Sequence, residues 1–405
     1  MSLLGIHLTL MIGPTIAVPA PVALVETLAG VEVTHNDQGR SGFRLTFQVG
    51  RSSVLDLVDY EQFLNPLLLK AFNRVVILVR FAIVPKVLMD GIITNVQLVP
   101  GNDPGSSTIT VVGEDLSVKM EMDNFQPLPW PALGDDNIVR AIIAKYGQYT
   151  IIPMVLPPTY PYIYSPTAHV KVQDKTDLAY IKCLAARRGY VFYIEPGPAP
   201  NTSTAYWGPP NRFTPPQKAL SVNMGPFSNV ESINFTNNAL GPTMVMGTIQ
   251  DSLTNVPVPV MTLPVSTRPP LAAMPALVFN QPNVRRSRVP VTPEDAHRNA
   301  AGAVEDCNDG RIAVGADITE AMAIAQATVD ASTDNVVTAT GVLNALEYGD
   351  LLSARGKVGV RGVGFSYNGD YYVKNVTHSI RKGEYKQRFT LSREGTGSLT
   401  PLVRP

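Results

Sequence analysis

Apolar and polar side chains alternate along much of the first third of the chain. Residues 43–49 place Phe, Leu, Phe and Val at every second position, which is the period of a strand with one buried face. Residues 75–84 form a more continuous apolar run, and we expect Pro85 to end that strand. Residues 91–99 and 107–113 flank the turn-forming sequence GNDPG, which predicts an antiparallel hairpin. The pattern indicates a β-sheet or β-barrel.

The N-terminal segment is apolar, which raises the question of a leader or a membrane helix. Residues 1–25 contain no acidic or basic side chain other than a histidine, so the basic region of a signal peptide is missing. Pro14, Pro19 and Pro21 would interrupt a membrane-spanning helix. We therefore expect a buried strand at residues 6–12, followed by an extended proline-rich crossing.

A helical period replaces the alternation after Trp130. Asp135 or Asp136 can cap a helix, and Gly147 is placed to end it in the left-handed conformation. The apolar positions of this helix recur every three or four residues and comprise Ile138, Ile142, Ile143 and Tyr146.

A second helix is predicted shortly afterwards. Thr176 or Asp177 begins it, two arginines occupy its last turn, where cations suit the helix dipole, and Gly189 ends it. A strand at residues 190–194 follows directly. Two helices with intervening strands predict a small α/β insertion in a chain that is otherwise β-rich.

The remaining segments return to β structure between irregular stretches. Residues 196–216 and 256–290 are rich in proline and typical of loops, whereas residues 294–308 and 318–329 have the composition of helices. Strands are expected at residues 230–235, 243–249, 357–363, 371–380 and 385–392, with two-residue turns at Asn368-Gly369 and Lys382-Gly383.

One internal similarity connects the two β-rich parts. The sequence Asn95-Val96 recurs as Asn375-Val376, which lies 280 positions further along (375 − 95 = 280). Two later identities keep the same spacing: Thr110 with Thr390, and Glu114 with Glu394. Few identities support it, so coincidence and duplication both stay open at this point. A duplicated chain would hold two related barrels around the α/β insertion.

Length, charge and cysteine content narrow the class of protein. A chain of 405 residues exceeds what one hydrophobic core usually serves, which predicts two or three domains. Lys and Arg number 33, as do Asp and Glu, so the positive excess typical of nucleic-acid or anionic-membrane binding is missing. Cys183 and Cys307 form no metal or disulfide pattern, which favours folding in a reducing cytoplasm.

Catalytic residue types are present but do not cluster. Neighbouring carboxylates point to opposite faces of a strand, or begin a helix, so they do not indicate a glycosidase pair; they are Glu114-Asp115, Asp135-Asp136 and Glu305-Asp306. The histidines have no metal-binding spacing; they are His7, His35, His169, His297 and His378. Residues 356–364 are glycine-rich without the phosphate-loop spacing. We expect no catalytic residue, no metal and no cofactor.

Two segments are typical of contacts with other proteins. Residues 285–288 read Arg-Arg-Ser-Arg, a basic cluster without the interleaved aromatic residues of a nucleic-acid site. Residues 157–164 are rich in tyrosine and proline, a composition found at protein interfaces and also in cores.

Several motifs occur in a fixed order along the chain. They are Gly113-Glu114-Asp115, Trp130 with Asp135-Asp136-Asn137-Ile138, Lys145-Tyr146-Gly147, Thr176-Asp177-Leu178, Leu184 to Tyr190, Gly349-Asp350, and Gly369 to His378. In this order they resemble the late control protein D family of phages and the hub region of VgrG-type spike proteins, the baseplate hubs of contractile tails. Each motif alone is weak, and their order carries the resemblance.

The resemblance implies a fold that is mainly β with an α/β insertion, built from three domains. Residues 1–128 would form a first tube-forming β-barrel domain, residues 129–218 an α/β insertion domain, and residues 219–405 a second tube-forming β-barrel domain with a helical insert. Such hubs are implied to be trimers, in which two similar barrels per subunit present a pseudo-sixfold ring. A threefold spike would thereby meet a sixfold tube without any catalysis.

The implied partners are further copies of this chain in a homotrimer, a central spike protein, the inner tube or its initiator protein, and baseplate wedge proteins. No nucleic-acid binding and no membrane insertion are implied. The implied location is the baseplate of a phage tail or injection particle, assembled in the bacterial cytoplasm.

The end of the sequence carries one further expectation. Relatives fused to a spike continue beyond the last strand, so we expect the spike of this system to be a separate protein. The expected spike-facing segment comprises Leu399, Thr400, Pro401, Leu402 and Val403.

Two other classes stay open. A cell-wall or polysaccharide hydrolase would need a cleft with paired carboxylates or a metal. A carbohydrate-binding β-barrel module of a tail would need exposed aromatic side chains on one barrel face.

Overall fold

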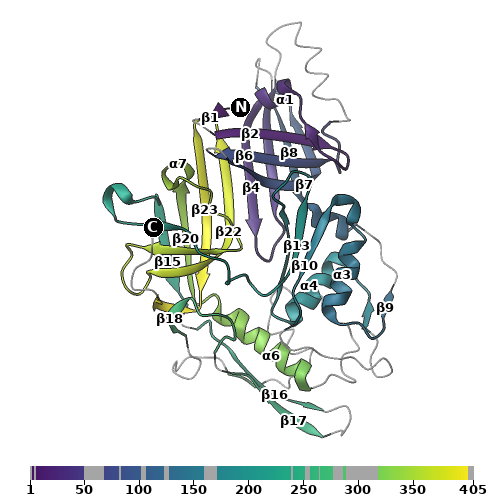
Figure 1. The fold of residues 1–405 in the computed structure, drawn as a ribbon, viewed down its shortest axis with the longest axis vertical. Helices are drawn as coiled ribbons and strands as arrows, with labels where there is room; N and C mark the ends of the chain where they lie inside the picture. Colours follow the sequence, from purple (N-terminus) through teal and green to yellow (C-terminus); the bar gives the residue numbers. More distant parts are fainter. Residues whose placement is uncertain are drawn as a thin grey trace.

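The computed structural model describes residues 2–3, 6–49, 68–81, 84–101, 106–122, 127–158, 171–238, 240–250, 256–263, 265–276, 286–288 and 318–399. Over these residues the protein is mainly β with a small α/β insertion, as the sequence predicts. In Figure 1 the purple N-terminal strands and the yellow C-terminal strands stand next to each other, and helices α3 (Asp135–Ala144) and α4 (Asp177–Arg187) lie to one side of them.

The N-terminal part of the large sheet contains six strands, which we call the first sheet unit. Their order across the sheet is β2, β6, β7, β8, β5, β4, and every neighbouring pair is antiparallel. Phe43, Leu45 and Phe47 of β5 point into one apolar core, as the alternation predicts. The bounds are β2 (Ile6–Gly13), β4 (Leu28–Asn36), β5 (Gly42–Val49), β6 (Arg74–Phe81), β7 (Val84–Val99) and β8 (Ser107–Asp115).

The C-terminal part of the same sheet contains six further strands, which we call the second sheet unit. Their order is β14, β21, β22, β23, β20, β15; β14 and β21 are parallel, and the other neighbours are antiparallel. Val373, Val376, Phe389 and Leu391 belong to its core. The bounds are β14 (Gln217–Ser221), β15 (Ser232–Asn237), β20 (Val337–Asn344), β21 (Lys357–Arg361), β22 (Gly369–Arg381) and β23 (Glu384–Arg393).

The α/β insertion packs α3 and α4 around its own apolar core, which includes Ile138, Ile142, Ile181 and Trp207. Its strands are β9 (Leu128–Trp130) paired with β11 (Lys171–Gln173), and β10 (Ile151–Val155), β13 (Ser203–Gly208) and β12 (Val191–Pro196) in one sheet. Short 3-10 helices η1 (Leu116–Met120) and η2 (Gly147–Tyr149) precede and follow α3.

The helix-end predictions are confirmed for α4 and wrong in part for α3. Thr176 caps α4, with its hydroxyl accepting a hydrogen bond from the Ala179 N–H at 3.3 Å, and Gly189 follows at a φ of 64°. The N-cap of α3 is Gly134, because the Asp135 carboxylate is engaged in ion pairs. Gly147 does not supply a left-handed ending, since the chain continues into η2.

The remaining elements are short. They are β1 (Ser2–Leu3), β3 (Val18–Pro19), α1 (Val22–Glu26), η3 (Gly225–Phe227), β16 (Met244–Gln250), β17 (Pro257–Met261), β18 (Ala272–Pro275), β19 (Arg286–Arg288), α6 (Ile318–Thr333), α7 (Ala345–Tyr348) and β24 (Gly395–Ser398). Helix α6 confirms the helix expected at residues 318–329. The helix expected at residues 294–308 lies outside the described residues.

Two turn and strand predictions are wrong and one is confirmed. Pro85 does not end a strand but is the second residue of β7, where proline is tolerated. Asn368-Gly369 is not a two-residue turn, because β21 ends at Arg361 and β22 begins at Gly369. Lys382-Gly383 does join β22 to β23 directly, with Gly383 at a φ of 84°.

Candidate functional site: a continuous sheet with two unpaired edges

The two sheet units are joined edge to edge by strands β4 and β22. Seven residues of each strand pair antiparallel, from Gly30 opposite Arg381 to Asn36 opposite Asn375. Across this seam the hydroxyls of Thr34 and Thr377 lie 3.1 Å apart, and the Asn375 side chain donates a hydrogen bond to that of Asn36. Figure 1 shows β4 beside β22. The chain therefore builds one sheet from segments separated by more than half of its length.

Arg355 connects this seam to the α/β insertion through hydrogen bonds of its guanidinium group. Its guanidinium donates hydrogen bonds to the Asn36 carbonyl at 2.7 and 3.0 Å, to the Ser41 hydroxyl at 2.7 Å and to the Ile194 carbonyl at 3.3 Å. It also lies over the Tyr193 ring, 3.9 Å from the centroid. Sequence reasoning missed this residue, because an isolated arginine outside any motif gives no local signal of such contacts.

A histidine pair, buried at His378 and half-buried at His35, lies on the core side of the same seam. The rings of His35 on β4 and His378 on β22 are 5.6 Å apart, edge to face. His378 Nδ1 faces the Tyr385 hydroxyl at 2.9 Å and the Gln387 amide at 3.1 Å. Burial lowers the pKa of His378 to about 3, and burial together with His378 and Arg355 lowers the pKa of His35 well below its usual value. Both imidazoles are therefore neutral near pH 7.

The two sheet units repeat the same arrangement of strands. Within each unit the six strands can be numbered one to six in the order in which they occur along the chain. Across the sheet, both units then have the same strand order: one, four, five, six, three, two. In the pairing of β7 with β8 the register shifts between Ile93 and Asn95, and in that of β22 with β23 it shifts between Val373 and Asn375. The irregularities therefore lie at Thr94 and Lys374. These positions are 280 residues apart (374 − 94 = 280), which is also the spacing between Asn95-Val96 and Asn375-Val376. These features favour duplication over coincidence. The identities Thr110 with Thr390 and Glu114 with Glu394 are not part of it, because Thr390 lies opposite Asn375 whereas Thr110 lies opposite Gln97.

One face of the continuous sheet carries many uncharged polar side chains, together with charged ones at Glu32, Arg44 and Arg388. Strand β4 contributes Thr34 and Asn36, and the same face continues through the second sheet unit. The other contributors are Thr46, Thr108, Thr110, Asn234, Thr236, Thr338, Thr340, Asn375, Thr377 and Thr390. A groove of about 510 Å³ runs over this face between β15 and β22. Most groups that this groove offers are neutral hydrogen-bonding side chains, and Arg388 is a charged residue in its lining.

Besides the outer edges of the short strands β1, β3 and β14, two strand edges of this sheet have no strand partner among the described residues. The first is the C-terminal part of β7, residues 94–99, which pairs with β8 on one side only. The second is the outer edge of β15, which pairs only with β20. All side chains from Thr94 to Val99 are exposed, including 40% of Val96 and 39% of Leu98. Sequence alternation predicts such strands but does not show which edges stay open.

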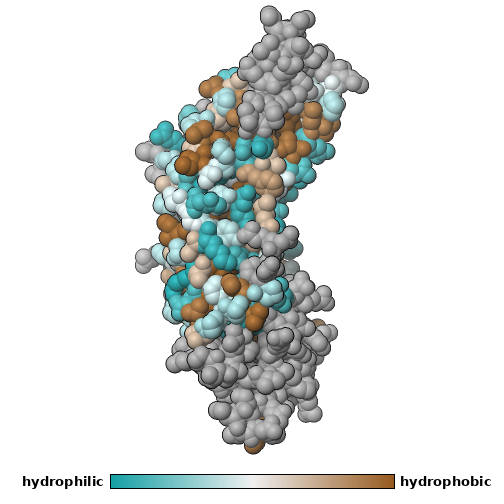
Figure 2. Space-filling view, turned by 90° about the vertical axis from the view of Figure 1, so that its right-hand side faces the viewer, coloured by the Kyte–Doolittle hydropathy of each residue, from teal (hydrophilic) through white to brown (hydrophobic). Residues whose placement is uncertain are grey.

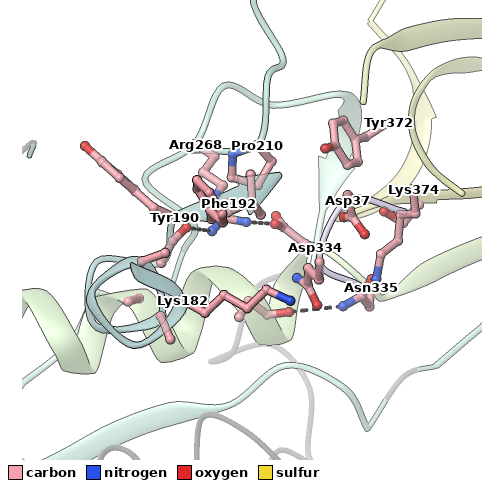
Figure 3. A pocket seen from close by; sticks show the side chains of 18 of the residues that line it. Asp37, Lys182, Tyr190, Phe192, Pro210, Arg268, Asp334, Asn335, Tyr372 and Lys374 are labelled. Carbon is pink, nitrogen blue, oxygen red and sulfur yellow. Dashed lines mark hydrogen bonds and ion pairs between the residues drawn. The ribbon is translucent and has the colours of Figure 1, made fainter. Parts of the chain in front are cut away.

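A cavity of about 420 Å³ lies where α4, α6 and β22 meet (Figure 3). Lys182 extends toward the side where Asp334 and Asn335 lie. The charged groups around it bind one another: Arg268 forms an ion pair with Asp334, and Lys374 donates a hydrogen bond to Asn335 at 3.0 Å. Burial lowers the pKa of Lys182 and raises that of Asp37. The cavity is lined by polar and apolar side chains of α4, α6 and β22, and its charged groups connect these parts of the chain.

The carboxylates considered for catalysis are used in structural contacts. Asp115 accepts hydrogen bonds from the N–H groups of Ser41 and Ser117, and Glu114 forms an ion pair with Arg40 at 2.7 Å. Asp135 pairs with Lys171 and Arg188. Glu305-Asp306, His169, His297 and Cys307 lie outside the described residues. Within the part of the chain that the structure describes, no group of three metal-binding side chains comes together.

The sequence-predicted spike-facing segment is described only at its first residue. Leu399 follows β24 and is 52% exposed. Thr400, Pro401, Leu402 and Val403 lie outside the described residues, as do residues 159–164 of the Tyr-Pro run. On the face drawn in Figure 2, hydrophobic side chains are scattered in small groups among hydrophilic ones. Of the helices described, none is long and apolar enough to cross a membrane.

Comparison with solved structures places this architecture among tail proteins. The tail protein from Neisseria meningitidis MC58 is 10% identical, with a TM-score of 0.60 over 97% of this chain and 98% of that chain. The 43 kDa tail protein of prophage MuSo2 from Shewanella oneidensis is 11% identical, with a TM-score of 0.60 over 96% and 98%. A chain of the Francisella PdpA-VgrG complex is 9% identical, with a TM-score of 0.55; all of this chain is covered, but only 55% of that one.

The chain therefore has the fold of hub-like phage tail proteins, which confirms the fold that the resemblance implies. No protein-family model matches the sequence, and no curated protein matches it.

Proposed function

We propose that this protein is the structural baseplate hub of a contractile tail or contractile injection system. In this role it is a trimer that matches a threefold spike to a sixfold inner tube. The observation that supports it most directly is the repeated strand arrangement: each chain carries two equivalent sheet units joined edge to edge. Three chains then supply six units, which is the number that a sixfold tube requires.

The polar face of the sheet supports the same function. In a ring of such units this face lines the lumen, where many threonine and asparagine side chains hydrogen-bond water and a few charged ones stand among them, at Glu32, Arg44 and Arg388. No catalytic step is part of the proposal; among the described residues, Glu114, Asp115 and Asp135 are engaged in structural contacts.

The proposed domains are residues 1–128 and 219–405 for the two tube-forming units and residues 129–218 for the insertion. The proposed partners are two further copies of the chain, a central spike protein bound through Leu399 to Val403, an inner tube or initiator protein, and wedge proteins. The proposed location is the baseplate of a phage tail or injection particle assembled in the bacterial cytoplasm.

The mass of the purified protein in solution tests this function. Light scattering at several concentrations, with and without the candidate spike protein, is expected to give three copies per particle, or one copy that becomes three when the spike is added. A monomer that is indifferent to the spike contradicts the proposal, and a screen for glycan binding or hydrolysis then follows.

A further inference from the structure

The two unpaired edges are the counterparts of the two edges that pair inside the chain. Strand β7 takes the place in the first sheet unit that β22 takes in the second, and β4 takes the place of β15. Inside the chain, β4 of the first unit pairs with β22 of the second. The counterpart contact would join β15 to β7, and both of these edges are open within one chain, as are the outer edges of the short strands β1, β3 and β14.

The register of this second contact follows from the internal repeat. Aligning the irregularities at Thr94 and Lys374 makes Asn95 equivalent to Asn375 and Gln97 equivalent to Thr377. The same alignment can be followed from strand to strand. In the first unit it passes from β8 through β5 to β4, and in the second from β23 through β20 to β15. Residues 30–36 are then equivalent to residues 232–238. Two identities support this alignment: Thr34 with Thr236, and Asn36 with Asn238.

Side chains on the two open strands are more exposed than their equivalents on the paired strands. This is the difference expected where a neighbouring strand is missing. Val376 is 0% exposed and His378 2%, whereas the equivalent Val96 and Leu98 are 40% and 39% exposed. On the other strand Val33 is fully buried, while the equivalent Phe235 is half-buried. Apolar side chains on a long open edge invite a further strand, since the backbone N–H and C=O groups there are unpaired.

We propose that β15 of one copy pairs antiparallel with the C-terminal part of β7 in the next copy, placing Asn238 opposite Asn95 and Thr236 opposite Gln97. The partner is a second copy of this chain, because the contact continues one that the chain already makes with itself. Each copy offers one edge of each kind, so the contact is head to tail, and it gives a ring where the rotation from one copy to the next closes. The ring size of three rests on the proposed function; the pairing does not.

Paired cysteines test the contact. The double variant Gln97→Cys with Thr236→Cys, and a second one on the opposite sheet face, Val96→Cys with Asn237→Cys, place cysteines directly opposite each other. Such positions lie about 4.5–5.5 Å apart between Cα atoms, within disulfide range. After mild oxidation we expect linked dimers and trimers on a non-reducing gel, with no larger products if the ring holds three copies.

Three matched controls accompany this experiment. Asn36→Cys with Asn375→Cys should link within the chain and leave its mass unchanged, because these residues pair in the structure. Gln97→Cys with Ser232→Cys moves one cysteine four residues along β15, about 13 Å away, and should not link. The oxidised wild type measures any background from Cys183 and Cys307.

The mass measurement separates the two proposals. Linked oligomers from an in-register pair, without linking of the shifted pair, support the strand pairing. A wild-type trimer in which neither in-register pair links contradicts the pairing and leaves the hub function standing. A wild-type monomer that neither assembles nor links contradicts both.

A single substitution gives an independent readout. Val96→Lys places a charge on the apolar side of the open β7 edge, a device that blocks strand pairing in natural proteins. We expect it to raise the dissociation constant of the assembly by about tenfold or more, with the thermal transition of the fold unchanged. Val22→Lys, at a 72% exposed valine away from both edges, is the control. Equal assembly of the two variants overturns the pairing.

Discussion

Arg355 shows how much of this architecture depends on single side chains. Its guanidinium donates hydrogen bonds to Asn36 and Ser41 at the connection between β4 and β5, and to Ile194 of β12. Leaving a buried acceptor without a donor costs about 1–3 kcal/mol. We therefore expect Arg355→Ala to lower the free energy of unfolding by about 2–4 kcal/mol in a denaturant titration.

The control for this substitution is Arg381→Ala. Arg381 is the exposed last residue of β22, so its removal should change the free energy of unfolding by less than about 0.5 kcal/mol. Equal losses for the two variants would show that Arg355 does not fasten the seam.

The histidine pair predicts a dependence of stability on pH. Gln387 accepts the Leu352 N–H through its side-chain oxygen, so its amide nitrogen must donate, and His378 Nδ1 must accept. The folded pKa of His378, about 3, lies below the unfolded value of about 6.5. The unfolded state therefore binds more protons, and the contribution of the neutral ring is complete above pH ~6.5 and falls as pH drops toward 3.

Each such histidine contributes a slope of about 1.4 kcal/mol per pH unit in that window. We expect His378→Gln to be less stable than the wild type at pH ~7.5 but to lose less stability between pH ~6.5 and ~5.5. Urea unfolding at each pH measures both quantities. A variant that keeps the full wild-type slope would mean that His378 is already protonated in the folded protein.

The sequence predicts the structural role of a residue where that role depends on atoms close to it along the chain. Thr176 and Gly189 were predictable because a cap and a left-handed ending depend on atoms only a few residues away. Arg355 was not, because its acceptor at Asn36 lies 319 positions away. Asp135 was misassigned as a cap for the same reason, since its partner Lys171 is brought to it by the pairing of β9 with β11.

At the scale of single elements, helix α4 offers the sharpest local test. Its Thr176 hydroxyl accepts a hydrogen bond from an N–H group that has no other partner in the first turn. We expect Thr176→Ala to lower the free energy of unfolding by about 1 kcal/mol and Thr176→Ser to restore it. If the two variants unfold at the same denaturant concentration, the hydroxyl contributes no cap.

Strands were predicted better than their partners. The alternation at residues 43–49 identifies β5 and its buried face, because one period describes a half-buried strand wherever it lies. The same alternation cannot show that β4 pairs with β22, since that pairing depends on residues at both ends of the chain. Pro85 was misread because a proline ends a central strand but is tolerated near a strand start.

For the whole molecule, the order of the weak motifs along the chain predicted the fold better than any single motif did. The fold predicted from that order agrees with the fold of solved tail proteins only about a tenth identical in sequence. The repeat was visible in a few identities, and it became informative once the irregularities at Thr94 and Lys374 fell at the same spacing. The open edges could not be foreseen, because an edge is defined by the absence of a neighbour.

The proposed assembly also has a predicted response to salt. The chain carries equal numbers of acidic and basic residues, and the edges proposed to meet contain no charged side chain at residues 94–99 or 232–237. Backbone hydrogen bonds and apolar contacts are little affected by screening, whereas charge pairs weaken as the Debye length shortens from about 10 Å at 0.1 M to about 3 Å at 1 M salt.

We therefore expect the dissociation constant of the assembly to change by less than about threefold over that range, when measured by light scattering during dilution. A loss of affinity of tenfold or more at high salt would mean that charged surfaces, and not strands β7 and β15, hold the copies together. The basic residues 285–288 would then be the first to replace.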